Sequence, residues 1–172
     1  PHTGEELWKV RYFGWSMVPR PLYGHGLVFV VVDYDHPELW AIRPDGRGEV
    51  TDTHVAWKIR KGMPNAASLL LIDDLLYMVN DMGLASCVEA KTGEIVWQER
   101  IEGAYWASPV YVDGRIYFFN RQADATVIEP GRQFHKLAFN QLDDLMMASP
   151  AVAGKAIFLR TSTHLYRIEN LP

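Results

Sequence analysis

Residues 108–119 read Ser-Pro-Val-Tyr-Val-Asp-Gly-Arg-Ile-Tyr-Phe-Phe. Apolar residues that favour β-strands stand on both sides of Asp113-Gly114, and this dipeptide suits a tight turn whose central residues need positive φ angles. The stretch therefore predicts two short antiparallel strands joined by a hairpin. Equivalent turns are expected at residues 24–26, 73–74 and 154–155.

The hairpin lies within a longer repeat. Ser108-Pro109 returns as Ser149-Pro150 after 41 residues, and Ser68 holds the same place 40 residues earlier. Arg20 holds it 48 residues before Ser68. A second marker, a segment that ends in an aromatic residue, recurs in step at Trp8, Trp57, Trp97 and Phe139. Both markers show the same lengthening of the first unit, which argues against chance similarity.

Each unit is predicted to contain four short antiparallel strands. The hairpin supplies the first two, the third is expected near residues 39–42, 85–89, 126–128 and 164–168, and the segment with the aromatic end is the fourth. No window of useful length shows helical periodicity. Four-stranded units at this spacing are typical of β-propeller blades. A β-sandwich is the alternative, but a sandwich gives no reason for the sequence to repeat.

Residues 87–97 resemble the tryptophan-docking motif of the PQQ-like (quinoprotein alcohol dehydrogenase-like) β-propeller repeat family, which is related in fold to the bacterial outer-membrane assembly lipoprotein propeller. That motif has Ala, Asp, Gly and Trp at fixed places; Cys87 and Glu89 replace the first two, whereas Gly93 and Trp97 match. The resemblance implies that each Trp lies over a Gly of a neighbouring blade, where a Cβ would hold the ring away. It gives a structural docking role to Gly4, Trp8, Trp57, Cys87, Glu89, Gly93 and Trp97.

The whole chain, residues 1–172, is predicted to be a single all-β propeller segment of about four repeats. Its expected parts are an outer strand of a preceding or clasp blade (1–13), a blade with an insertion (14–61), two further blades (62–102 and 103–142) and an incomplete last blade (143–172). The resemblance implies a ring of seven or eight blades, of which this chain supplies about half.

Ring closure is the open question of this organisation. The N-terminus has an outer strand in surplus and the last blade lacks one, so pairing the two would act as a clasp that removes an exposed edge. We expect either a missing N-terminal half or a homodimer to complete the ring. A closed ring of four blades is a third alternative.

Composition excludes two classes of function. Hydrophobic residues make up 48% of the chain and charged residues 22%, which is typical of a packed globular fold. The net charge is −4, so no broad nucleic-acid surface is expected. The longest unbroken apolar stretch, residues 27–32, is too short for a membrane span.

The resemblance also raises an enzyme alternative, part of a PQQ- and Ca²⁺-dependent alcohol or sugar dehydrogenase. Such enzymes resemble one another in a pair of adjacent cysteines near the cofactor and in an Asp base beside Glu and Asn calcium ligands. This chain has a single cysteine, Cys87, and no such acidic trio can be matched. We therefore expect no catalytic residue, no metal ligand and no cofactor.

Two groups of residues are candidates for binding. Trp15 and Trp106 come just before predicted inner strands, at the mouth of the ring, where aromatic rings could stack on a sugar or a peptide. Asp45, Asp52 and His54 are polar groups of the insertion; plain solvated turns are their simpler interpretation, because residues 45–48 lack the ligand spacing of a calcium loop.

Together these observations predict a non-catalytic propeller segment. It is expected to act as a protein-binding or scaffolding module with a protein partner, since the functions of propellers reside in the loops around a rigid ring. The family resemblance implies a bacterial protein that is periplasmic or secreted.

Overall fold

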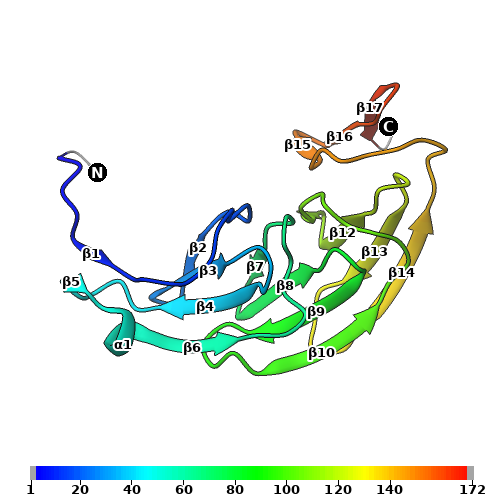
Figure 1. The fold of residues 1–172 in the computed structure, drawn as a ribbon. Helices are drawn as coiled ribbons and strands as arrows, with labels where there is room; N and C mark the ends of the chain where they lie inside the picture. The colour runs from blue at the N-terminus through cyan, green and yellow to red at the C-terminus, as the bar shows by residue number, and fades with distance from the viewer. Residues whose placement is uncertain (1–2, 170–172) are drawn as a thin grey trace.

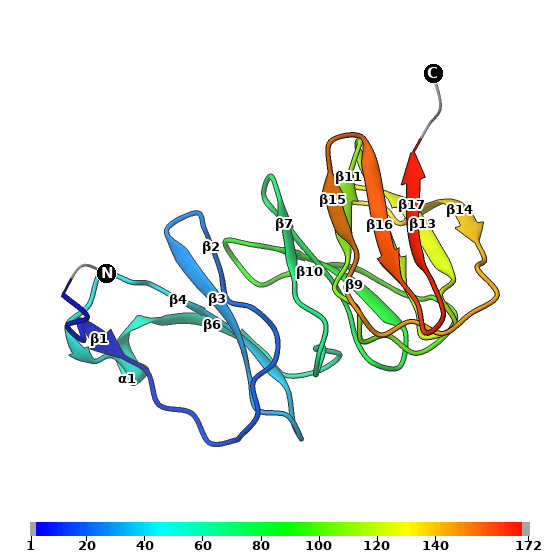
Figure 2. The same cartoon turned by 90° about the horizontal axis from the view of Figure 1, so that it is seen from above.

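The structure, a computed structural model, describes residues 3–169 and consists of successive antiparallel sheets arranged along an arc (Figure 1). Figure 2 shows the sheets standing side by side, each packed against the next. This arrangement confirms the predicted all-β fold of four-stranded blades and matches part of a propeller.

Within residues 3–169, three blades are complete and a fourth has three strands. Blade 1 contains β2 (Leu22–Gly24), β3 (Leu27–Val32), β4 (Glu38–Ile42) and β6 (Val55–Ile59). Blade 2 contains β7 (Leu70–Ile72), β8 (Leu75–Val79), β9 (Leu84–Glu89) and β10 (Ile95–Arg100). Blade 3 contains β11 (Val110–Val112), β12 (Arg115–Phe119), β13 (Ala125–Glu129) and β14 (His135–Asn140). Blade 4 contains β15 (Ala151–Ala153), β16 (Ala156–Arg160) and β17 (Leu165–Glu169).

The predicted hairpin turns are confirmed by their backbone angles. His25, Asp73 and Asp113 have φ angles of 52°, 50° and 48° between the first two strands of blades 1, 2 and 3. Gly154 has a φ of 59° at the same place in blade 4. Each turn joins strands in tight antiparallel register, as with Val112 opposite Arg115.

The fourth strands differ from the prediction in two ways. Residues 51–54 form a single helical turn, α1 (Thr51–His54), so that β6 begins only at Val55. The strands β6 and β10 also continue past Trp57 and Trp97, which therefore lie inside the strands. A register shift just before each Trp marks a β-bulge, an extra residue that the regular spacing of the sequence does not reveal.

The bulge also shows that the docking position predicted for blade 3 is wrong by one residue. Trp57 lies opposite Ala41 and Trp97 opposite Cys87, directly after the register shift. The residue in that place in β14 is Ala138, not Phe139. Because successive side chains of a strand point to opposite faces, Phe139 cannot substitute for the docking Trp.

The N-terminal segment forms a strand shorter than expected. Within residues 3–169, β1 (Trp8–Lys9) pairs in parallel with β5 (Gly48–Glu49) of the blade 1 insertion and not with β17. β1 and β17 lie at opposite ends of the arc (Figure 1), so the clasp stays a prediction.

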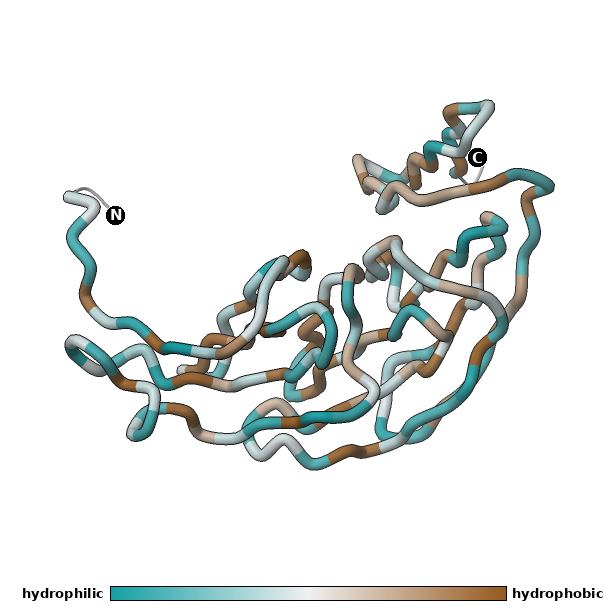
Figure 3. Tube along the Cα trace, viewed as in Figure 1, coloured by the Kyte–Doolittle hydropathy of each residue, from teal (hydrophilic) through white to brown (hydrophobic). Residues whose placement is uncertain are grey.

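The hydrophobic core consists of layers between successive blades. Figure 3 shows apolar and polar stretches alternating along the sheets. Phe29 and Leu39 of blade 1 pack with Leu76 and Met78 of blade 2, and blades 2 and 3 meet in the same way. A further layer lies on the free face of blade 1, where the N-terminal segment covers buried side chains of β3 and β4. The buried residues are Val32, Trp40 and Ile42, and the N-terminal residues packed on them include Trp8, Val10 and Tyr12. In the part of the chain that the structure describes, no helix has the length and apolarity needed to cross a membrane.

Candidate binding surfaces

Of the predicted docking residues, Trp57 and Gly93 meet at the junction between blades 1 and 2. A Cβ added to Gly93 would lie 2.7 Å from Cδ2 of Trp57, and Gly93 has a φ of +76°. The indole Nε1 of Trp57 donates a hydrogen bond to the carbonyl oxygen of Ala90, at 3.2 Å. The first junction thus requires glycine for both reasons, the close approach of the ring and the backbone angle.

The second junction uses the same hydrogen bond without the glycine. Nε1 of Trp97 donates to the carbonyl oxygen of Gly131 at 3.0 Å. Phe134, three residues beyond Gly131 just as Gly93 is three beyond Ala90, meets the Trp97 ring edge-on at 5.2 Å between centroids. The hydroxyl of Tyr77 accepts a hydrogen bond from the amide of Gly131 at 2.8 Å.

The remaining predicted docking residues have different surroundings. Glu89 accepts a hydrogen bond from Arg132 of the next blade, at 2.5 Å. Cys87 is fully buried beside Tyr77, and burial raises the pKa of its thiol to about 11, so it remains a protonated packing group at neutral pH. Gly4 has a φ of +69° in open space, and Trp8 packs on the free face of blade 1.

A ladder of hydrogen bonds joins the starts of the inner strands. The amide of Arg20 donates to Oγ of Ser68 (3.0 Å), the amide of Ser68 to Oγ of Ser108 (3.0 Å) and the amide of Ser108 to Oγ of Ser149 (2.9 Å). The recurring serines therefore act as framework residues that join neighbouring blades.

Each blade has two ends, and the antiparallel order of the strands sorts the connections between them. The loops that precede the inner strands and the turns between second and third strands share one end, here called the loop face: residues 13–21, 33–37, 60–69, 80–83, 101–109, 120–124, 141–150 and 161–164. The hairpin turns and the connections to the fourth strands share the other end, the hairpin face. Hydrogen bonds tie the loop face together, as from the Tyr105 amide to the Asp81 carbonyl at 3.1 Å.

The two faces differ in exposed apolar side chains. The loop face carries nine large ones: Phe13, Trp15, Met17, Val18, Tyr34, Met82, Trp106, Leu145 and Met147. Among residues 3–169, the connections of the hairpin face carry none. Apolar groups concentrated on one face mark an interaction surface.

Trp15 and Trp106 both lie on the loop face, in blades 1 and 3. The Trp15 ring is 57% exposed, packs at 5.3 Å from Tyr34 and is held by a hydrogen bond from its Nε1 to Oδ2 of Asp35, at 2.9 Å. The Arg121 guanidinium lies 4.3 Å from the centroid of the Trp106 ring. These contacts fix both rings while leaving part of each accessible.

The three polar candidates of the insertion lie elsewhere. Asp45 and His54 come together at 3.6 Å between Oδ1 and Nε2. They follow the end of β4, whereas the Asp35 that holds Trp15 precedes its start, so the two groups occupy opposite ends of the blade. Asp52 lies exposed in α1. The structure therefore does not bring all five candidates into one site.

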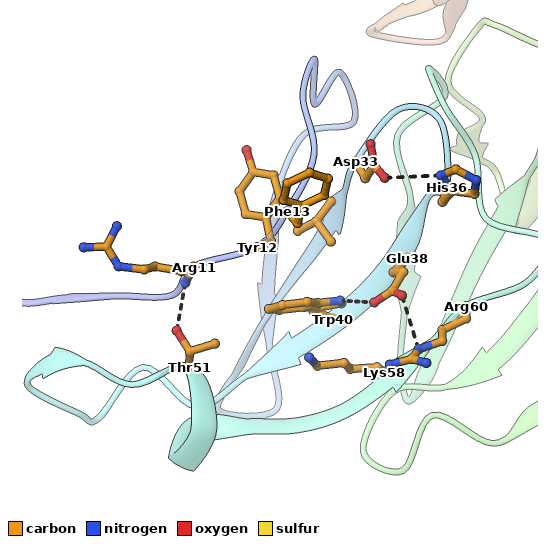
Figure 4. A pocket seen from close by; sticks show the side chains of 11 residues that line it. Arg11, Tyr12, Phe13, Asp33, His36, Glu38, Trp40, Thr51, Lys58 and Arg60 are labelled. Atoms are coloured by element: carbon orange, nitrogen blue, oxygen red, sulfur yellow. Dashed lines mark hydrogen bonds and ion pairs between the residues drawn. The ribbon is translucent and has the colours of Figure 1, made fainter.

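A further pocket, of about 420 Å³, lies on the free face of blade 1 and was not predicted (Figure 4). Nε1 of Trp40 donates to Oε2 of Glu38 at 2.8 Å, and Oε1 of Glu38 pairs with Arg60 at 3.2 Å. The Lys58 ammonium lies 3.5 Å from the Trp40 ring centroid, and the fully exposed Phe13 stands at the rim. The sequence does indicate one side of this pocket. Because successive side chains of a strand point to opposite faces, Lys58 lies on the face of β6 opposite the docking residue Trp57.

The side chains present do not fit a PQQ–calcium pair. Over residues 3–169, no three His, Cys, Asp or Glu side chains converge as metal ligands. The single thiol, Cys87, is buried between blades and has no neighbouring cysteine.

Comparison with known proteins gives a family and a fold. The sequence profile described as outer membrane protein assembly factor BamB, a PQQ-type repeat family, matches residues 1–163. No curated protein sequence matches significantly. BamB from Moraxella catarrhalis aligns over 84% of this chain and 43% of its own, with 13% identity and a TM-score of 0.64.

Two other solved structures are similar in fold. A quinohemoprotein alcohol dehydrogenase from Pseudomonas putida aligns over 90% of this chain and 30% of its own, with 10% identity and a TM-score of 0.71. The computationally designed Ika4 protein aligns over 96% of this chain and 98% of its own, with 10% identity and a TM-score of 0.74. The chain thus spans less than half the length of BamB and of the quinohemoprotein alcohol dehydrogenase.

Proposed function

Because the chain belongs to the PQQ-type repeat family described as outer membrane protein assembly factor BamB, we propose that it is a protein-binding segment of a bacterial envelope propeller. Its loop face is the binding surface. The observation that supports this proposal is the unequal distribution of exposed apolar side chains, nine on the loop face and none on the connections of the hairpin face among residues 3–169.

The chemistry of the loop face suits an apolar protein segment. Trp15 and Trp106 offer large rings already ordered by Asp35 and Arg121, so that binding costs little side-chain entropy. Met82 and Met147 are exposed and adaptable, and methionines fit irregular apolar partners. We assign the rings as anchors and the methionines as the surrounding contact area.

Photo-crosslinking can test which face binds. A photoreactive residue is placed at Met82 or Met147 on the loop face and, as matched controls, at Arg115 or Lys155 on the hairpin face; all four side chains are exposed. Covalent capture of the same envelope protein is expected from the first two positions only. Equal capture from both faces, or capture from the hairpin face alone, would contradict the proposal.

The role of the two rings is tested in the same assay. Trp15→Ala combined with Trp106→Ala is expected to lower the crosslinked yield from Met82 about tenfold or more, because interface energy concentrates in buried aromatic anchors. The far-ultraviolet circular dichroism should stay unchanged, since both rings are surface groups. An unchanged yield would show that the rings are not anchors.

A further inference from the structure

A pocket of about 290 Å³ lies between blades 2 and 3, along their outer strands β10 and β14. It is called the rim pocket here, because these strands run along the convex side of the arc (Figure 1). Residues 100–102 line it from blade 2, and Thr126, Phe134, Lys136 and Phe139 line it from blade 3. Both of its walls belong to four-stranded blades within residues 3–169.

The apolar part of the rim pocket is aromatic. Phe139 follows the docking position of β14, which faces the next blade, so the Phe139 ring faces blade 2. Phe134 stands beside it and meets the Trp97 ring edge-on at 5.2 Å between centroids. Both phenyl rings are half-buried, and the buried side chain of Ile101 lies on the other wall. Part of each phenyl ring thus remains available to a further apolar group.

Two cations border this apolar surface. The Lys136 ammonium lies 5.9 Å from the centroid of the Phe139 ring, and Nη1 of Arg100 donates to the carbonyl oxygen of Met82 at 2.7 Å. Among residues 3–169, neither Lys136 nor Arg100 forms an ion pair. A guanidinium has five N–H donors, so Arg100 retains others for an anion. Glu102 adds one carboxylate to the lining, which leaves a net charge suited to a single negative charge.

The repeat shows that the fold does not require this chemistry. Lys136 and Phe139 stand 41 residues after Ile95 and Gln98, their counterparts in blade 2. There the Gln98 side chain donates from Nε2 to Oγ of Ser86 at 3.0 Å and lies against its own sheet. The same place in the fold is therefore occupied by an amide in one blade and by a cation and a phenyl ring in the next. The change indicates a role particular to this junction.

The wall from blade 2 is held in place by hydrogen bonds. The amide of Ile101 donates to the carbonyl oxygen of Gly83 at 2.9 Å. The carbonyl oxygen of Glu102 accepts from the Tyr105 hydroxyl at 2.7 Å and from Nδ2 of Asn120 at 3.3 Å. A ligand therefore meets a wall that is already ordered, which lowers the entropic cost of binding.

From these observations we propose that the rim pocket binds a small aromatic monocarboxylate. The ligand ring packs on Phe134 and Phe139, and its carboxylate accepts hydrogen bonds from Lys136 and Arg100. The volume is close to the lower limit of ligand pockets, about 300 Å³, so one ring with a short acid chain fits. This site lies apart from the Trp15 and Trp106 anchors of the loop face, so either proposal can fail without the other.

Phenylacetate is a suitable probe for the rim pocket, and its binding can be measured by nuclear magnetic resonance titration. We expect saturable binding with a Kd of about 1 mM, as for a ligand of this size. Phenylacetamide lacks the charge and acetate lacks the ring, so both should bind at least tenfold more weakly. Nuclear Overhauser effects from the ligand ring to the methyl groups of Ile101 and Thr126 locate the site. Added salt should weaken phenylacetate binding, because the cations are near the surface.

Two variants test the residues that the proposal assigns. Phe139→Gln introduces the residue that blade 2 has at this place and should weaken phenylacetate binding at least fivefold. Lys136→Gln should weaken it about threefold and reduce the preference for phenylacetate over phenylacetamide. Lys155→Gln removes an exposed lysine from the hairpin face and serves as the matched control, with no expected change. Thermal melts verify that all three variants are folded.

Every outcome decides the proposal. The absence of saturation at ten times the expected Kd would overturn it, as would equal affinities for phenylacetate and phenylacetamide. Nuclear Overhauser effects only to residues outside the rim pocket, or an unchanged Kd in Phe139→Gln, would also contradict it. If Phe139→Gln proves to be unstable, Lys136→Gln provides the decision, because its side chain is exposed and an unchanged Kd there would overturn the assignment of the cation.

Discussion

The junctions between blades 1 and 2 and between blades 2 and 3 solve the same packing problem differently. In both, an indole donates to a carbonyl oxygen of the next blade, that of Ala90 or that of Gly131. In the first the ring lies against Gly93, whereas in the second it meets the edge of Phe134. The hydrogen bond is thus the constant part of the contact, and the glycine is needed only where the ring approaches the backbone face-on.

The largest effect is expected from Gly93→Val. The new side chain meets the Trp57 ring and adopts a positive φ, so the free energy of unfolding should fall by about 3–5 kcal/mol. Gly131→Ala is the matched control, because a Cβ there meets nothing within 4 Å; it should change stability by less than about 1 kcal/mol. Urea unfolding measures the free energy of unfolding of both variants. Similar losses of stability would show that the first junction does not depend on glycine more than the second.

A smaller difference is expected when the indole hydrogen bonds are removed. Trp57→Phe leaves the buried Ala90 carbonyl without its indole donor and should cost about 2–3 kcal/mol. Trp97→Phe should cost about 1 kcal/mol less, since the Gly131 carbonyl also accepts from the Tyr77 hydroxyl at 3.5 Å. If chemical denaturation gives equal losses for both variants, the Tyr77 contact adds nothing.

The smallest effect concerns Cys87, which faces Trp97 where Ala41 faces Trp57. Cys87→Ala makes the two junctions alike and should cost no more than about 1 kcal/mol at pH 7. Burial raises the thiol pKa to about 11, so the folded state keeps a proton that the unfolded state has released. Stability of the wild type should therefore fall as the pH rises from the ordinary thiol value towards 11, and Cys87→Ala should weaken this slope. Unfolding curves from pH 7 to 11 measure the difference.

The sequence predicts the blades well because their signals are local. Asp113-Gly114 and its equivalents determine the hairpins through backbone angles that few residues adopt. The position of Phe139 was predicted wrongly: a bulge precedes the docking position in all three blades, and the residue directly after it in β14 is Ala138, so Phe139 points to the other face. The prediction followed the aromatic side chain, although the 41-residue spacing between Ser108 and Ser149 leads from Trp97 to Ala138.

The candidate binding residues were predicted only in part. Trp15 and Trp106 were identifiable because aromatic residues before inner strands must lie near the loops. The pocket beside Trp40 was not, because it depends on how residues 8–13 fold back onto blade 1. That packing joins segments far apart in the sequence, and the alternation of Trp57 and Lys58 on β6 indicates only the face on which Lys58 lies.

The serine ladder has an evolutionary consequence. Each rung takes its donor from one unit and its acceptor from the next, always from the same place in the repeat. Duplicating the DNA of one unit therefore copies a backbone donor together with a serine acceptor. The added blade can form the same hydrogen bonds with both of its neighbours, without further substitutions at the new junctions. Ancestral propellers could in this way gain or lose whole blades in single genetic events.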